Sequence, residues 1–419
     1  MNRKEELKRQ LSSAACLLLG AASVASGGEF EGWDIDTSVL HYQESDGRVS
    51  AVEPSVRLRK EFSEKKAVEL KLVLDALTGA TPNGAAAALT PQTFTTPSGN
   101  DTYKAEAGEI PLDPTFRDTR IAVSGNWQQP LGRYSLAVLG ANFSKEYDFL
   151  SYGANATLSR DLNQRNTTLT LGLSTEFDKI TPVGGVPTPF AAMAAPNATQ
   201  PRIGSEDSKD ILDAILGLTQ VINRRMLMQF NYSLSRANGY LNDPYKLISR
   251  VDGNTGATND YVYENRPDSR LKNSLYWLTR YHLTRDVISA SYRYFTDDWG
   301  IKSHTVDLNY HWKMAEKHYL EPRVRFYQQS AADFYRISLI SGDPTPQEAS
   351  ADYRLAKFDG ITVGLKYGWA FRDESSLMLR LDYYSTMGEQ TPESAVGAQR
   401  LLNQYPDLGA TIFQIQYSF

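Results

Sequence analysis

The last nine residues, TIFQIQYSF, alternate between two kinds of side chain and strongly restrict what this chain can fold into. On an extended strand one face carries Thr411, Phe413, Ile415, Tyr417 and Phe419. The other face is polar except for Ile412. An aromatic-ended alternation of this kind is typical of a transmembrane β-strand, with lipid on one face and water on the other. A soluble edge strand of this sequence would expose its large apolar side chains to water.

The same period of two recurs along the whole chain and predicts sixteen strands. In residues 68–75, for example, Val68, Leu70 and Leu72 alternate with Glu69 and Lys71. The predicted strands cover residues 33–39, 52–62, 68–75, 120–127, 134–143, 152–159, 167–177, 211–221, 226–234, 274–281, 287–295, 306–312, 320–326, 361–367, 377–383 and 411–419. An even, closed set leaves no unpaired strand edge in lipid, where an unsatisfied backbone group is costly.

The connections between these strands are alternately short and long. Short polar links occur at 63–66, 128–133, 162–166, 222–224, 282–286, 313–317 and 370–375. Many of the others are long, namely 78–116, 178–208, 237–270, 328–358 and 385–408. Transmembrane barrels have short periplasmic turns and longer extracellular loops. The expected fold is therefore all-β, a single antiparallel transmembrane β-barrel formed by residues 27–419.

The N-terminus has the pattern of an export signal. Basic residues within 3–9 precede the apolar stretch 11–25, and Ser26–Gly27 fits a cleavage site, which makes 1–26 the expected signal peptide. The single cysteine, Cys16, lies inside it, so the processed chain has no thiol for a disulfide or a metal. Tyr417 and Phe419 resemble the C-terminal signal read by the outer-membrane assembly machinery. These features predict the outer membrane of a Gram-negative bacterium, with outer-membrane lipid and that machinery as partners.

Composition excludes several classes of protein. The formal net charge is −5, so no basic excess favours nucleic acid. The 5 histidines form no HxH or HExxH spacing, and no CxxCH, Walker or GxGxxG motif occurs. We therefore expect no cofactor, no metal and no enzymatic activity. His311 beside Asp307 is conceivable as a metal ligand, but a solvated side chain is the simpler interpretation.

Charged side chains share the face opposite to the apolar one. The candidates for lining a lumen are Arg57, Arg59, Glu61, Glu69, Lys71, Arg120, Arg280, Asp307, His311, Arg323, Arg325, Arg380 and Asp382. Interleaved arginines and carboxylates can form ladders across strands and set the field inside a pore. They can equally do no more than solvate and brace the wall. No continuous apolar run lies on this face, which disfavours a channel for hydrophobic substrates.

Two loop segments contain candidates for contacting a ligand. Asp297, Asp298 and His304 cluster near an expected extracellular rim, as a loop-borne hydrolase requires, although Asp and Gly there also suit a tight turn. Their two carboxylates alone are weak evidence for calcium. Tyr240, Asp243 and Tyr245 lie in GYLNDPYK, which is either turn chemistry or a contact site.

The longest connection, 78–116, has two possible positions. It is rich in Ala, Thr and Pro and contains few aromatic residues from which to build a core. It can fold into the lumen as a plug, or it can remain a mobile extracellular loop.

Five segments also resemble those of a known family: DALTGATPNGA (75–85), GYLNDPYK (239–246), YRYFTDDWGIKSHT (292–305), YQQSAADFY (327–335) and ADYRLAKF (351–358). The chain is similar in them to an uncharacterised family of proteobacterial outer-membrane β-barrel proteins of unknown function. The resemblance covers most of the chain after residue 26. The resemblance implies a barrel and no established mechanism. It also implies exported redox partners, such as thioredoxin-like proteins and flavin-attachment enzymes, which bear only on the second of the functions below.

Three functions follow as hypotheses. The leading one is a porin-like channel for small polar solutes. The second is a structural or sheath barrel that holds an exported redox or lipoprotein partner. The third is a loop-borne outer-membrane hydrolase.

Overall fold

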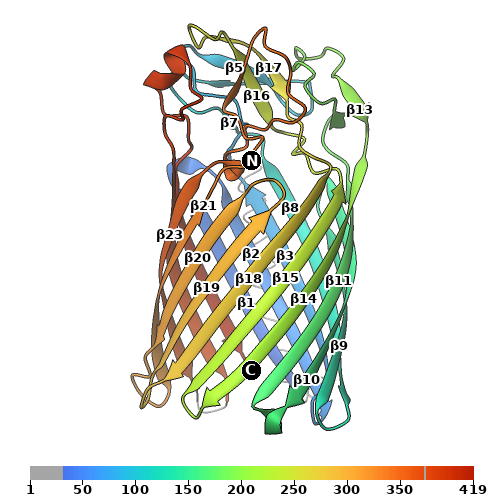
Figure 1. The fold of residues 1–419 in the computed structure, drawn as a ribbon, viewed down its shortest axis with the longest axis vertical. Coiled ribbons are helices and arrows are strands. Elements are labelled where there is room, and N and C mark those ends of the chain that lie inside the picture. The colour runs from blue at the N-terminus through green and yellow to red at the C-terminus, as the bar shows by residue number, and fades with distance from the viewer. Residues whose placement is uncertain (1–31, 372–373) are drawn as a thin grey trace, which may run out of the picture.

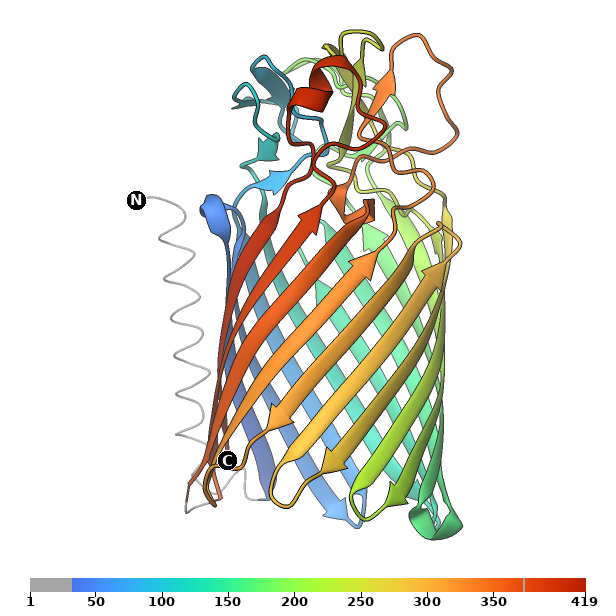
Figure 2. The ribbon, with the colours of Figure 1, turned by 60° about the vertical axis from the view of Figure 1, so that its left-hand side comes forward.

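The computed structural model describes residues 32–371 and 374–419 as one closed antiparallel barrel of sixteen strands under a cap of loops (Figures 1 and 2). In order around the ring the strands are β1 (Trp33–Glu44), β2 (Ser50–Ser63), β3 (Lys66–Thr78), β8 (Arg117–Leu131), β9 (Ser135–Lys145), β10 (Phe149–Leu162), β11 (Thr167–Ile180), β14 (Asp207–Asn223), β15 (Met226–Gly239), β18 (Ser269–His282), β19 (Val287–Asp297), β20 (Lys302–His311), β21 (His318–Gln329), β23 (Phe358–Ala370), β24 (Ser376–Gly388) and β25 (Leu408–Ser418).

The sequence-based count and order of the strands are confirmed. Most strands extend several residues further toward the long-loop rim than predicted: β18 begins at Ser269 rather than at residue 274, and β14 begins at Asp207 rather than at 211. These extensions contain polar residues such as Lys272 and Asp210. Hydrogen bonding between strands continues where the apolar alternation has ended, because closure of the ring satisfies the backbone whatever the side chain.

The first and last strands close the ring. β1 pairs with β25 from Asp36 opposite Ser418 to Glu44 opposite Ala410. Ile35 and Phe419 extend this pairing by exchanging backbone hydrogen bonds of 2.8 and 3.0 Å. Every barrel strand thus has a partner on both sides.

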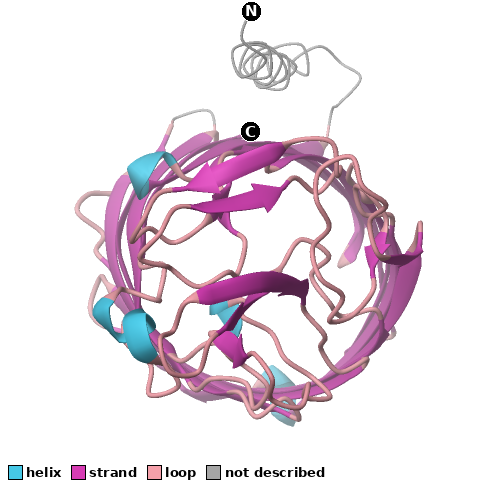
Figure 3. Cartoon of the chain, turned by 90° about the horizontal axis from the view of Figure 1, so that it is seen from above, coloured by secondary structure: helices cyan, strands magenta, loops and turns pink. Residues whose placement is uncertain are grey.

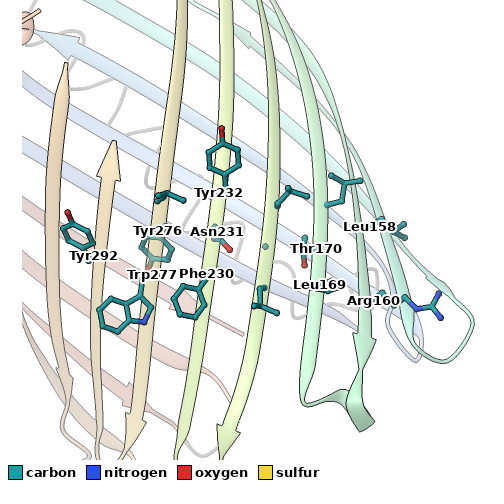
Figure 4. Close-up of a pocket in the computed structure, with 15 residues that line it drawn as sticks. Leu158, Arg160, Leu169, Thr170, Phe230, Asn231, Tyr232, Tyr276, Trp277 and Tyr292 are labelled. Atoms are coloured by element: carbon teal, nitrogen blue, oxygen red, sulfur yellow. The ribbon is translucent and has the colours of Figure 1, made fainter. Parts of the chain in front are cut away.

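The outer face of the wall is apolar. Leu139, Leu158 and Leu216 are 57%, 46% and 56% exposed, as expected for side chains that meet lipid rather than water. Leu158, Leu169, Phe230 and Trp277 line a shallow apolar groove across β10–β18 on this face (Figure 4).

Aromatic side chains gather on the outer face beside the short turns. Phe62 lies 6.0 Å from Trp127 between ring centroids, and Trp369 lies 4.4 Å from Phe371. Lys66 lies over the ring of Trp127. Amphipathic rings and lysines favour the layer of lipid headgroups, so this rim has the character of a membrane interface.

The long connections fold together into a cap over the opposite rim (Figure 3). They form small sheets of their own, with strands β4 (Thr81–Pro82), β5 (Gln92–Thr95), β6 (Thr102–Ala105), β7 (Leu112–Asp113), β12 (Val186–Pro187), β13 (Arg202–Gly204), β16 (Leu247–Val251), β17 (Thr258–Tyr263) and β22 (Ser338–Ile340). Among the described residues, short 3₁₀ helices occur on the cap side at Ser45–Gly47, Tyr353–Leu355 and Gly397–Leu401, and in a short turn of the opposite rim at Asn163–Arg165.

The connection between β3 and β8 is part of this cap. Phe94 is fully buried there and packs with Tyr103 and Leu247. The backbone NH of Leu247 donates to the carbonyl of Asn83 at 2.8 Å. This connection is therefore an ordered component of the cap that is fastened to the β15–β18 connection. A core forms despite its low aromatic content because its partner loops supply apolar surface.

Some expectations fall outside the described residues. These are the signal peptide 1–26 and its cleavage at Ser26–Gly27. Within the described part of the chain, no helix has the length and apolar character needed to cross a bilayer.

The pairing of β1 with β25 leads to a prediction about assembly. Replacing Phe419 with Ser removes a ring that lies 5.6 Å from that of Tyr417, beside the closing strand pair. We expect a lower fraction of folded barrel, measured as the heat-modifiable band on an electrophoresis gel. Phe419→Tyr, which keeps the ring, is the matched control and should assemble normally. If the Phe419→Ser variant assembled as well as the unmodified protein, the Phe419 ring would not be needed for closure of the barrel.

Candidate functional site: a charged lumen beneath a loop cap

The polar face of the wall is lined by ion pairs, some between neighbouring strands and some within one strand. Several of the residues proposed from the sequence to line the lumen form these ion pairs. Sequence periodicity predicts the face on which each residue lies but not its partner. The pairs are Arg57 with Asp36 and Glu69, Arg120 with Asp75, Arg323 with Asp307, Arg380 with Asp382 and Arg59 with Glu61. Lys71 lies opposite Arg57 in the β2–β3 register. These pairs are partly exposed, so each contributes about 1 kcal/mol or less to stability.

His311 belongs to a mixed cluster. Its Nδ1 lies 3.1 Å from a carboxylate oxygen of Glu321, whose other oxygen lies 2.6 Å from Nζ of Lys366. The imidazole ring packs on Tyr319, with 4.4 Å between ring centroids. One carboxylate, one imidazole and one ammonium satisfy each other here. Among the described residues, no group of three or more His, Cys, Asp or Glu side chains is arranged to hold a metal ion.

A different sector of the wall has many small side chains, together with carboxylates that include Glu176, Asp178 and Asp213. The polar face of β9, β10, β11, β14 and β15 presents small side chains, among them Gly140, Asn142, Gly153, Asn155, Thr170, Gly172, Gly217 and Asn231. A Cβ on Gly140 would lie 2.2 Å from the amide oxygen of Asn126 and 2.6 Å from the amide nitrogen of Asn155. Glycine is required at that position because the asparagine side chains of adjacent strands lie over it.

Two cavities lie along the charged side of the lumen. One, of about 580 Å³, is lined by polar-face residues of β18–β23, including Arg280, Asp307, His311, Arg323 and Arg325. The other, of about 1190 Å³, lies beneath the cap and we call it the cap chamber. Arg293 and Arg325 line both cavities.

The cap chamber has an acidic and a basic side. Its carboxylates on the β7–β10 side are Asp113, Asp118, Glu146 and Asp148, with Arg117 as a cation beside them. The cations on the β14–β21 side are Lys209, Arg270, Lys272, Arg293 and Arg325. Strands β8–β10 and β19–β21 occupy opposite halves of the ring, so the two signs of charge face each other across the chamber.

The acidic side holds a carboxyl group with an unusual proton affinity. Burial, followed by the charge of Asp118, raises the pKa of Glu146 to about 7. Arg120 acts in the opposite direction and Asp148 reinforces the rise. Burial also raises the pKa of Asp148, which accepts a hydrogen bond from the hydroxyl of Tyr245.

A buried charge cluster, which we call the cap latch, joins two cap loops. Arg266 contacts Glu264 at 2.6 Å and Asp352 at 2.9 Å, and Arg354 contacts Asp352 and Asp243 at 2.5 and 2.6 Å. Side chains of Glu264 and Asp352 are each 1% exposed. The latch ties the β15–β18 connection to the β21–β23 connection. These residues, unlike Asp243, were not among the sequence-based candidates, because they lie in loops without periodicity.

Burial and the neighbouring cations shift the pKa values of the latch carboxylates. Burial disfavours the charged form of Asp352, yet Arg354, Lys246 and Arg266 hold its pKa well below the usual range. Its contribution to cap stability is therefore complete above the ordinary carboxyl pKa near 4 and is lost only at strongly acidic pH. Burial raises the pKa of Glu264, although Arg266 offsets part of the rise.

The GYLNDPYK candidates lie inside the cap and line the chamber. Tyr240 is 9% exposed and packs with Ile180 and Val186. Asp243 belongs to the cap latch, and the Tyr245 hydroxyl also accepts a hydrogen bond of 3.0 Å from the NH of Val183. All three line the cap chamber.

The three candidates for a hydrolytic site are not brought together. Asp297 accepts hydrogen bonds from the backbone NH of Trp299 and Ile301 and pairs with Arg270. Asp298 accepts from the NH of Leu271 at 2.9 Å. His304 shares the outer face with the exposed Val306, and its Nδ1 lies 2.7 Å from the hydroxyl of Tyr292. The aspartates thus serve turn geometry, while the imidazole lies on the opposite face of the wall.

Other lumen residues did not stand out as candidates in the sequence. Lys272 lies beyond the predicted start of its strand, and Arg293 lies in a strand that was predicted only as a range. Following the alternation of polar and apolar residues through 269–297 would have identified Lys272 and Arg293 as lumen residues.

Together, the closed ring, apolar exterior and polar interior define an outer-membrane-type β-barrel. A family model matches residues 8–419, and the chain belongs to that family, which is described as "Protein of unknown function (DUF3570)". No curated protein matches the sequence.

Solved structures with a similar fold include the ferric enterobactin receptor PfeA of Pseudomonas aeruginosa, as a Q482A mutant bound to enterobactin, at 10% identity and a TM-score of 0.44. That match covers 92% of this chain and 60% of the receptor, so the chain spans about three fifths of the receptor's length. CdiB from Acinetobacter baumannii matches at 10% identity and a TM-score of 0.45, over 93% of this chain and 60% of CdiB. A bacterial polysaccharide outer membrane secretin matches at 6% identity and a TM-score of 0.45, over 94% of this chain and 99% of the secretin.

The cap latch generates a prediction about local stability. Asp352→Asn removes a buried carboxylate shared by the buried Arg266 and the more exposed Arg354, and breaking a buried ion pair in this way costs about 3–5 kcal/mol. We expect amide hydrogen exchange in the two latched loops to accelerate by about 100-fold or more, while the barrel strands keep their protection. The control is Asp343→Asn, an exposed position in the same loop. Unchanged exchange in the Asp352→Asn variant would contradict the role of the latch.

Glu146 generates a prediction about pH. Carboxyl carbon NMR of the folded barrel should give half-protonation of Glu146 near pH 7. Asp118→Asn removes the charge that, after burial, contributes most to the raised pKa of Glu146, so the midpoint should move toward 4.5. Asp101→Asn, which lines the same chamber, should leave the midpoint in place. An ordinary carboxyl midpoint in the unmodified protein would refute the assignment.

Proposed function

We propose that this protein is an exported outer-membrane channel that lets small polar solutes cross passively through its lumen. The apolar exterior with its aromatic rim supports insertion in a bilayer. The long-loop rim with its cap would then face outward, and the short turns would face the periplasm.

The observation that carries the proposal is the charged wall shared by two cavities. Arg293 and Arg325 line both the cap chamber and the cavity below it. A polar solute leaving the chamber would meet fixed charges along the wall rather than an apolar surface. Arginine stays protonated in such an environment, so these charges are permanent.

A second candidate function is a sheath barrel that holds an exported redox or lipoprotein partner. The observation that favours it is the interlocked cap over one rim, fastened by the latch and by small apolar clusters such as that of Phe94 and Leu247. A cap of this kind suits a closed barrel as well as a selective one. A loop-borne hydrolase has less support, since Asp297 and His304 lie on opposite faces of the wall.

The channel proposal predicts conductance. Purified, refolded protein in a planar bilayer should give stable conductance steps in KCl. Arg323→Glu combined with Arg325→Glu should shift the reversal potential in a salt gradient toward cation selectivity, because four units of charge change on one wall. Arg133→Glu with Arg165→Glu, in two short turns, is the charge-matched control. Absence of conductance, together with co-purification of an exported partner from native membranes, would replace the channel with the sheath.

A further inference from the structure

Strands β18–β21 arrange cations on the polar face in successive register rows. One row contains Tyr276, Arg293 and Thr305. The next contains Leu278, Ser291, Asp307 and Arg325, and the third contains Arg280, Ser289, Asn309 and Arg323. Lys272 lies two rows further toward the cap, opposite Asp297. Adjacent rows on one face lie about 7 Å apart along a strand, since each residue advances about 3.3 Å.

Each of these rows holds one cation outside the ion pairs of the wall. Among the ion pairs of the described residues, Arg270 uses Asp297, Arg323 uses Asp307 and Lys366 uses Glu321. We use the name cation ladder for Lys272, Arg280, Arg293 and Arg325. None of these four side chains takes part in an ion pair of the described residues. Elsewhere on the wall Arg57 and Arg120 both have carboxylate partners.

The ladder passes through both cavities. Lys272 lines the cap chamber, Arg293 and Arg325 line both cavities, and Arg280 lines the lower one. The lower cavity contains five arginine or lysine side chains against two carboxylates, Asp307 and Glu321. Both carboxylates are already engaged by cations. The ladder therefore leaves a surplus of positive charge along a continuous path.

Aromatic surface accompanies the ladder. The Arg293 guanidinium lies 5.5 Å from the ring centroid of Tyr276 on the adjacent strand. This contact holds the guanidinium on the wall without neutralising its charge. The sector of β9–β15 has small side chains beside the ladder, and its Asp213 shares a register row with Lys272, the ladder residue nearest the cap.

We infer that the cation ladder binds and guides elongated solutes that have several oxyanion groups, either carboxylates or phosphates, along the lumen. This inference rests on the proposed channel function and specifies its solute class. A small monovalent anion contacts one cation at a time, whereas a chain of oxyanions can contact two or more. Charge-assisted hydrogen bonds from arginine to such groups are short and directional, which favours polyvalent over monovalent anions.

The test is block of the KCl current by two probes, tripolyphosphate and butane-1,2,3,4-tetracarboxylate, added on the cap side. Both should reduce current in the unmodified barrel at concentrations where neutral maltotriose has no effect. Arg293→Gln with Arg325→Gln should raise the half-blocking concentration by about tenfold or more, because two charged contacts are lost. Arg133→Gln with Arg165→Gln removes the same charge from the short turns and should leave block unchanged.

The outcomes separate this inference from the channel proposal. A conducting barrel that neither probe blocks, or whose block is equal in both double variants, overturns the ladder and leaves the channel intact. Block by one probe alone supports the ladder and assigns its oxyanion. If the barrel does not conduct, calorimetric titration of the detergent-solubilised protein with tripolyphosphate decides: binding weakened by Arg293→Gln with Arg325→Gln supports the ladder, and no binding overturns it.

Discussion

Closure of the hydrogen-bonded ring is the constraint on which the rest of this structure depends. A strand edge exposed to lipid would leave backbone groups unsatisfied at a cost of several kcal/mol each. The pairing of β1 with β25 removes the last such edge. Once the ring is closed, strict alternation assigns every side chain to lipid or to the lumen. The exposed Leu139 and the ion-paired Arg57 are two consequences of the same geometry.

The cap obeys different physics from the wall. Its loops have no periodic pattern and are held by small apolar clusters and by a buried ion cluster. A buried ion cluster is weak evidence for net stability, because removing charges from water offsets much of their attraction. Its strength lies in specificity, since Arg266 and Asp352 fit each other only when two loops 86 residues apart adopt one arrangement. The cap and the chamber beneath it are therefore defined together.

The lumen is divided into sectors with different electrostatic character. Paired charges brace the side around β1–β8, β9–β15 carry many small side chains with a few carboxylates, and surplus cations follow β18–β21. The carboxylates near Glu146 face those cations across the cap chamber. This division connects the architecture to function, because the wall that would guide a solute is distinct from the walls that maintain the cylinder.

The alternation of side chains determined the strand number, the two faces and the short and long connections, because that pattern is local and each strand contains it. Several lumen residues, such as Arg323 and Arg325, could also be proposed from parity. Their partners could not, because a pair such as Arg120 with Asp75 depends on the register between β3 and β8, across a connection of thirty-eight residues. Only the tertiary structure placed the β3–β8 connection in the cap, assembled the latch from Glu264, Arg266 and Asp352, and separated His304 from Asp297. Those arrangements arise from contacts between distant segments, and no local periodicity encodes them.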